Sequence, residues 1–109
     1  MKVFQENLTS KILQQNSSSL VNKQKKEIDI LEIGCGDGNI TNHIIKKRKK
    51  NHNFYLSDIS IDAVRAAKKN IKYKKCTFRI GKWLNPWKDK RFDIIISDVA
   101  SINDFIAKK

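Results

Sequence analysis

The sequence has little of what usually bends, cross-links or anchors a chain. Its 109 residues include one proline, two cysteines and four glycines. No apolar run approaches the roughly 18 residues that would span a membrane, and the N-terminus lacks the apolar region of a signal peptide. Cys35 and Cys76 form no metal-ligand pattern, so we expect no metal site. We expect both cysteines to be free thiols in a reducing, cytoplasmic setting.

Acidic residues are also scarce, with 11 Asp and Glu against 23 Lys and Arg, for a formal net charge of +12. Such a surplus can indicate a polyanionic partner such as RNA, DNA or an anionic membrane face. It can also be compositional, because Lys, Asn and Ile are all abundant and the cations fall mostly on expected helix exteriors and loops. Nucleic acid therefore stays a candidate partner, through residues 46–50 and 72–75, and we expect no membrane partner.

A chain of this length forms one domain at most, and its most informative segment begins with an apolar run at residues 28–33. Gly34, Gly36 and Gly38 follow that run at alternate positions. Glycine lets the backbone turn sharply and come close to a ligand, so a strand, a glycine-rich turn and then a helix predict a nucleotide-cofactor loop. A dinucleotide fingerprint would place its third glycine at position 39, which holds Asn39. A tight turn without a ligand is the alternative interpretation.

Apolar spacing predicts alternating strands and helices around this segment. The expected strands cover residues 28–33, 53–57, 76–80 and 92–97. The expected helices cover residues 4–15, 39–49, 61–71 and 100–107, the third with Ser60 as its N-cap and Ile61 on its buried face. Strands separated by helices imply right-handed crossovers and a parallel sheet with helices on both faces.

An acidic residue, Asp58, ends the second expected strand, twenty residues after Gly38. A carboxylate at this place can accept charged hydrogen bonds from the two hydroxyls of a cofactor ribose, although helix capping is the alternative role. Together, Glu32-x-Gly34-x-Gly36-x-Gly38 and Asp58-Ile59-Ser60 resemble the first two motifs of the class I S-adenosylmethionine-dependent methyltransferases.

This resemblance implies an α/β fold of the Rossmann-like type, a three-layer sandwich with a mostly parallel sheet in the order 3-2-1-4. It implies S-adenosylmethionine as cofactor, with the glycine turn and Cys35 passing under the methionine and ribose portion. Glu32 would support the turn or reach the ligand's amino group, directly or through water, whereas a salt bridge to a lysine is the alternative. Residues 28–109 would form the cofactor-binding domain, preceded by a helical segment and connector over residues 1–27.

The adenine end of the expected site departs from the family pattern. Related methyltransferases commonly have an acidic residue after the glycine that follows strand 3, but here Lys82 follows Gly81. A lysine cannot accept a hydrogen bond from the adenine amino group, so contacts would come from the backbone or from Trp83. Trp83 and Trp87 can equally cover the edge of the sheet.

The fourth expected strand leads into Asp98-Val99-Ala100, which resembles the family's motif IV without its Pro-Pro-aromatic platform. Asp98 is the candidate catalytic residue, placed to orient or deprotonate a nucleophile, and helix capping is its alternative role. The sequence supplies four strands of the usual seven, so we expect the C-terminal strands to be missing. Strand 4 would then be an open apolar edge that seeks self-association or a protein partner.

The sequence therefore predicts a short methyltransferase that transfers the sulfonium methyl to a nucleophile it does not identify. One rival interpretation is a non-catalytic subunit that binds S-adenosylmethionine or a partner. Another is a module that binds NAD or a nucleotide sugar.

Overall fold

The computed structural model describes the backbone of residues 2–6 and 10–98, and the side chains of residues 11–97. The helix expected over residues 100–107 lies outside this range. In the part that is described, no helix is both long and apolar enough to cross a membrane.

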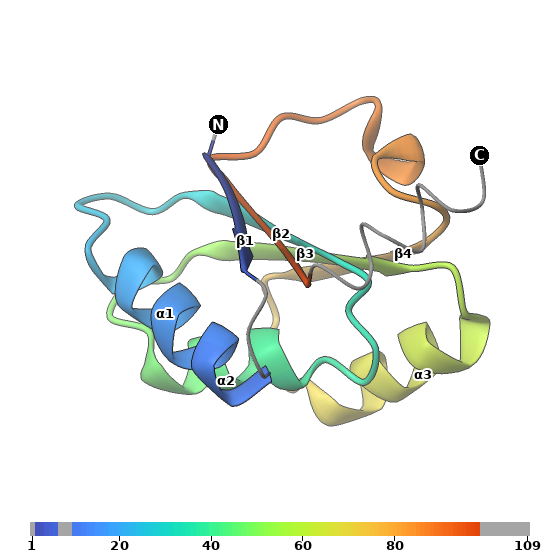
Figure 1. The fold of residues 1–109 in the computed structure, drawn as a ribbon, viewed down its shortest axis with the longest axis horizontal. Coiled ribbons are helices and arrows are strands. Elements are labelled where there is room, and N and C mark those ends of the chain that lie inside the picture. Colours follow the sequence, from blue (N-terminus) through green and yellow to red (C-terminus); the bar gives the residue numbers. More distant parts are fainter. Residues whose placement is uncertain (1, 7–9, 99–109) are drawn as a thin grey trace.

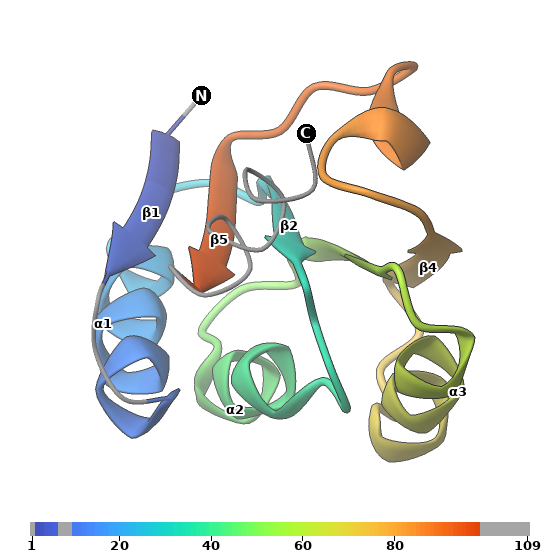
Figure 2. The ribbon, with the colours of Figure 1, turned by 45° about the vertical axis from the view of Figure 1, so that its right-hand side comes forward.

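A five-stranded parallel sheet forms the centre of the molecule, in the order β1-β5-β2-β3-β4 (Figure 2). The strands are β1 (Lys2–Glu6), β2 (Asp29–Ile33), β3 (Asn53–Asp58), β4 (Cys76–Ile80) and β5 (Ile94–Asp98). The register places Leu31 of β2 between Ile95 of β5 and Tyr55 of β3. The four expected strands lie in the order that the resemblance implied, which confirms the Rossmann-like fold class.

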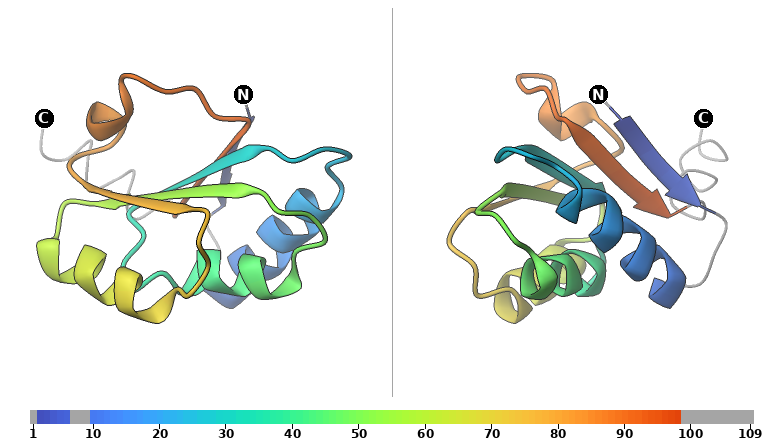
Figure 3. Two further views of the ribbon diagram at one scale, coloured as in Figure 1. Left: turned by 180° about the vertical axis from the view of Figure 1, so that it is seen from behind. Right: turned by 90° about the vertical axis from the view of Figure 1, so that its left-hand side faces the viewer.

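The first strand corrects two expectations about the ends of the chain. Residues 4–15 were expected to form one helix, but β1 ends at Glu6 and helix α1 (Ser10–Asn22) starts four residues later. Strand β1 pairs with the whole of β5, from Lys2↔Ile94 to Glu6↔Asp98 (Figure 3). The prediction of an open edge at β5 is therefore wrong. Pairing with the free backbone groups of β5 outweighs the weak helical spacing of the first residues.

Three helices cover one face of the sheet (Figure 1). They are α1, α2 (Asn39–Lys47) and α3 (Ile61–Asn70), and the Ser60 hydroxyl caps α3 by accepting from Ala63 N–H at 3.2 Å, as expected. The larger hydrophobic core lies between these helices and the sheet. Its fully buried members include Leu13, Ile30, Ile44, Phe54, Leu56, Ala67 and Ile96.

The opposite face is covered by the connection from β4 to β5 rather than by a long helix of the described chain. This connection returns across the sheet from its β4 edge to β5, and a right-handed crossover in that direction must run on the face away from α1–α3. A short 3-10 helix, Asn85–Trp87, brings Trp87 onto Leu31 and Ile95. The Trp87 indole N–H donates to the Ser57 hydroxyl at 2.9 Å. Trp87 is thus a core residue of this face.

Candidate cofactor site

The glycine turn between β2 and α2 is left-handed at each of its three glycines. The φ angles are 69° at Gly34, 55° at Gly36 and 85° at Gly38, which residues with a Cβ adopt only at a cost. The turn is tied to the neighbouring strand because the N–H groups of Gly34 and Cys35 both donate to Ser57 O, at 2.9 and 3.0 Å. The sequence prediction of strand, glycine turn and helix is confirmed.

The glycines at 36 and 38 have different neighbours. A Cβ added at Gly36 would meet no atom within 4 Å, so this part of the turn borders open space. A Cβ at Gly38 would lie 2.8 Å from Ile71 Cδ1 and 3.2 Å from Ala67 Cβ. Gly36 therefore leaves room for a ligand, whereas Gly38 lets the start of α2 approach the residues of α3 closely. The spacing of the glycines did not distinguish these roles.

Asp58 connects the glycine turn to the start of α3. Its Oδ2 accepts from Gly36 N–H and its Oδ1 accepts from Ser60 N–H, both at 2.9 Å. The cap of α3 itself is the Ser60 side chain, so helix capping does not account for Asp58. Each carboxylate oxygen has a further lone pair, and the side chain is only partly buried, so it can also accept from hydroxyl groups of a ligand.

Glu32 lies beneath the turn and is 3% exposed. Its Oε1 accepts from the Thr41 hydroxyl at 2.7 Å. Burial raises the pKa of Glu32 to about 8, against the hydrogen bonds from Thr41 that lower it. The expected alternative of a lysine salt bridge is not seen, since the two ion pairs of the described residues join Lys75 to Glu27 and Arg79 to Asp89.

Thr41 is a site residue that sequence reasoning missed. It is buried on α2 beside Ile40, Ile44 and Ile45, on the face that packs on the sheet. A hydroxyl on an otherwise apolar helix face needs a hydrogen-bond partner, and that was the available signal. Which partner it has depends on how α2 sits over β2.

Cys35 is a buried thiol inside the turn. Burial raises the pKa of the Cys35 thiol, and the nearby Glu32 adds to the effect, so the sulfur stays protonated at neutral pH. Burial also raises the pKa of Cys76, to about 11, and this thiol is free as well. Among the residues that the structure describes, no group of three or more His, Cys, Asp or Glu side chains could hold a metal ion.

Exposed isoleucines surround Asp58. Ile59 is 48% exposed, and Ile61 and Ile80 are each 51% exposed. Ile61 was expected on the buried face of α3, but the helix turns it outward at its first position. Ile80 is the register partner of Asp58 in β4. This end of the sheet therefore offers apolar surface next to a carboxylate, which suits a planar base attached to a ribose.

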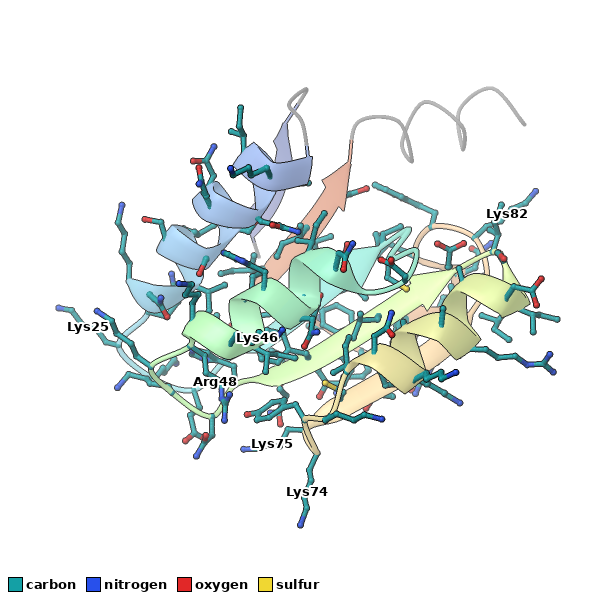
Figure 4. All side chains as sticks on the ribbon, turned by 90° about the horizontal axis from the view of Figure 1, so that it is seen from below. Lys25, Lys46, Arg48, Lys74, Lys75 and Lys82 are labelled. Atoms are coloured by element: carbon teal, nitrogen blue, oxygen red, sulfur yellow. The ribbon has the colours of Figure 1, made fainter. Side chains whose placement is uncertain are left out.

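Lys82 and Trp83 follow the end of β4. Gly81 N–H donates to Asp58 O at 3.0 Å, and a Cβ at Gly81 would overlap the ring of Pro86. Lys82 is exposed and lies at the far end of the molecule from Lys74 and Lys75 (Figure 4). Trp83 has a φ of 49° and packs, partly buried, against the cluster that contains Trp87. Trp83 thus packs on the sheet, which is one of the two roles that the sequence suggested for it.

Asp98 is the last residue of β5, where its backbone pairs with Glu6 of β1. All five strands are parallel, so their carboxyl ends meet at one edge of the sheet. Asp98, Asp58, Ile80 and the glycine turn therefore belong to the same edge. The side chain of Asp98 lies outside the described residues, and its catalytic role stays a prediction.

Residues 24–109 match the family model described as a methyltransferase domain, so the chain belongs to the methyltransferase domain family. This match spans most of the chain and agrees with the glycine turn and the fold. A comparison with curated protein sequences found no relative.

Solved structures of methyltransferases share the fold. A ribosomal protein L11 methylase from Lactobacillus delbrueckii subsp. bulgaricus has a TM-score of 0.69 at 19% identity, over 91% of this chain and 52% of that one. A dimethyladenosine transferase from Plasmodium falciparum has a TM-score of 0.65 at 23% identity, over 92% of this chain and 36% of that one. The plantazolicin methyltransferase BpumL, solved in complex with SAH, has a TM-score of 0.60 at 25% identity, over 78% of this chain and 33% of that one. The chain thus spans from a third to about half of these proteins.

Proposed function

We propose that this chain binds S-adenosylmethionine at the carboxyl end of the sheet and transfers its methyl group to a nucleophile. The observation that carries the proposal is the open space over Gly36 directly beside the Asp58 carboxylate. Membership of the methyltransferase domain family and the SAH complex of BpumL support it.

The residues at this edge fit such a ligand. Asp58 would accept hydrogen bonds from the ribose hydroxyls, and Ile59 with its exposed neighbours would cover a face of the adenine. Glu32, buried under the turn, would hold the turn through Thr41 and favour the ligand's ammonium group. Lys82 and Trp83 remain candidates for the adenine end through the backbone and the ring.

The cofactor would supply an electrophilic methyl group, and the chain's main contribution would be alignment of the nucleophile with that methyl. Asp98 at the end of β5 is the candidate residue to orient the nucleophile. It would act as a base only for a nucleophile that is protonated at the working pH. We assign the cofactor-binding part to residues 28–109 and a supporting role to residues 1–27, in a cytoplasmic protein with reduced thiols.

Titration calorimetry with S-adenosylhomocysteine tests the binding. Wild type should bind, Asp58→Ala should lose about 10-fold or more in affinity, and Asp62→Ala, an exposed neighbour on α3, should bind like wild type. Gly36→Val should abolish binding because its side chain fills the open space. Equal affinities for wild type and Asp58→Ala would remove Asp58 from the site, and tighter binding of NAD would favour the nucleotide-binding alternative.

Turnover separates an enzyme from a non-catalytic subunit. Methyl transfer by the chain to any acceptor, lost in Asp98→Ala with cofactor affinity retained, would support catalysis with Asp98 at the substrate. Cofactor binding without transfer to protein, RNA or small-molecule acceptors would favour the non-catalytic alternative.

A further inference from the structure

A second charged surface lies at the amino end of the sheet, away from the glycine turn. It consists of the cations in residues 23–26, 46–50 and 72–75, which follow α1, end α2 and follow α3; we call it the basic end. These segments hold three, five and three Lys or Arg residues respectively, and no acidic residue. Figure 4 shows Lys25, Lys46, Arg48, Lys74 and Lys75 gathered at this end, with Lys82 at the other.

The charge of the basic end is largely uncompensated. Within the described residues, its one ion pair joins Lys75 to Glu27 at 3.5 Å, and both side chains are about half exposed. The carbonyl end of a helix carries roughly half a negative charge, which attracts cations such as Lys46 and Lys47 in the last turn of α2. That effect is too small to balance five consecutive cations, so a net positive potential remains at the surface.

The surface is also shaped. A groove of about 470 Å³ runs between α2 and the segment after α3, with Lys46 and Arg48 on one side and Lys72 and Tyr73 on the other. The Arg48 guanidinium lies 4.2 Å above the Tyr73 ring and donates to Ile45 O at 2.8 Å. The Arg48–Tyr73 contact joins the two sides of the groove, and Lys46 and Lys72 are exposed among its lining residues.

The kind of polyanion follows from what else is exposed there. The large exposed hydrophobic side chains of the described residues are Ile12, Ile59, Ile61 and Ile80, and none belongs to the basic end. A membrane-binding surface combines cations with apolar side chains that enter the lipid, whereas contacts to phosphate groups need only cations and polar donors. The basic end has the second composition.

We propose that the basic end binds the phosphate backbone of nucleic acid, at a surface separate from the cofactor site. The groove positions the strand between Lys46 and Lys72, and the remaining cations neutralise phosphates beside it. Sequence preference does not arise from these contacts, so RNA and DNA of one sequence should differ only through their backbone geometry.

Fluorescence anisotropy with labelled single-stranded RNA and with DNA of the same sequence tests this, without any cofactor. Wild type should bind at low salt, and log affinity should fall linearly with log salt. The exposed triple variant Lys46→Glu, Lys49→Glu, Lys72→Glu should lose about 10-fold or more in affinity and show a shallower salt slope. The control Lys11→Glu, Arg65→Glu, Lys88→Glu makes the same charge change at exposed positions outside the basic end and should stay within about threefold.

Three outcomes would overturn the proposal: no binding of either oligonucleotide at low salt, equal losses in the two triple variants, or equally tight and equally variant-sensitive binding of phosphatidylserine vesicles. Calorimetry with S-adenosylhomocysteine on the Lys46/Lys49/Lys72 variant separates this proposal from the proposed function. Its cofactor affinity should equal that of wild type, because the two surfaces lie at opposite ends of the sheet.

Discussion

At the carboxyl end of the sheet, Glu32 and Asp58 are held by hydrogen bonds of 2.7 and 2.9 Å to α2 and to the glycine turn. At the amino end, the lysines of the basic end lie mostly exposed around helix ends. Within the described residues, only Lys75 among them forms an ion pair, with Glu27. Glu32 is buried and Asp58 is partly buried, and both carboxylates have defined hydrogen-bond partners, whereas the lysines of the basic end are mostly exposed to solvent. Substitutions should therefore act sharply on folding and ligand affinity at one end, and gradually on charge at the other.

The largest effect on stability should come from Gly38→Val. The new side chain meets Ile71 and Ala67 and sits at a φ of 85°, so we expect the free energy of unfolding to fall by about 3–5 kcal/mol. In Gly36→Ala the new methyl group enters open space, so the left-handed backbone is the only source of strain. We expect the free energy of unfolding to fall by about 1–2 kcal/mol. Urea unfolding of both variants makes the measurement. Equal losses would contradict the different roles of the two glycines.

A smaller effect should follow from the buried carboxyl of Glu32, and it depends on pH. The pKa of Glu32 is raised from 4.5 to about 8, so below pH 4.5 the folded and unfolded states are both protonated and burial carries no ionisation cost. Between pH 4.5 and 8 the unfolded state loses its proton first, and stability falls as pH rises. The whole shift corresponds to about 5 kcal/mol, since one pKa unit corresponds to about 1.4 kcal/mol, and roughly 2–4 kcal/mol of that loss should fall between pH 5 and pH 8.

Glu32→Gln isolates that effect, because its side-chain oxygen can still accept from Thr41 and does not titrate. Urea midpoints from pH 5 to pH 8 should decline more steeply for wild type than for Glu32→Gln. Parallel profiles would show that Glu32 does not carry the pH dependence. If a ligand ammonium reaches Glu32, cofactor binding should also release protons, which calorimetry in buffers of different ionisation heat detects.

The smallest effect on stability should come from the basic end. The variant Lys46→Glu, Lys49→Glu, Lys72→Glu changes exposed side chains, so its free energy of unfolding should stay within about 0.5 kcal/mol of wild type per site. Urea unfolding at low and high salt checks this. A large loss of stability would mean that these lysines support the fold, which would contradict the difference drawn between the two ends of the sheet.

Sequence reasoning predicted the regular part of the fold well for a physical reason. Strands β2 to β5 and helices α2 and α3 carry strong local signals, such as the three isoleucines of β5 and the Ser60 cap. The first residues carry no such signal. Their strand depends on β5, more than ninety positions away in the register Lys2↔Ile94, and local spacing cannot report a partner at that distance.

The candidate site was predictable in position but not in detail. The glycine turn and Asp58 could be placed because strand, turn and acid follow each other at characteristic spacing. The pairing of Glu32 with Thr41, the contact of Gly38 with α3 and the outward turn of Ile61 all depend on how the helices sit on the sheet. Those arrangements arise from packing in three dimensions, for which the spacing of residues carries little information.

Amide chemical shifts of the labelled protein during titration with S-adenosylhomocysteine test the central claim most directly, because they observe both ends of the sheet at once. The account predicts shifts in residues 34–38 and 58–60, with residues 46–50 and 72–75 unchanged. Shifts confined to the basic end would contradict it. So would the absence of any shift at a ligand concentration of about 1 mM, at which even weak binding is detected.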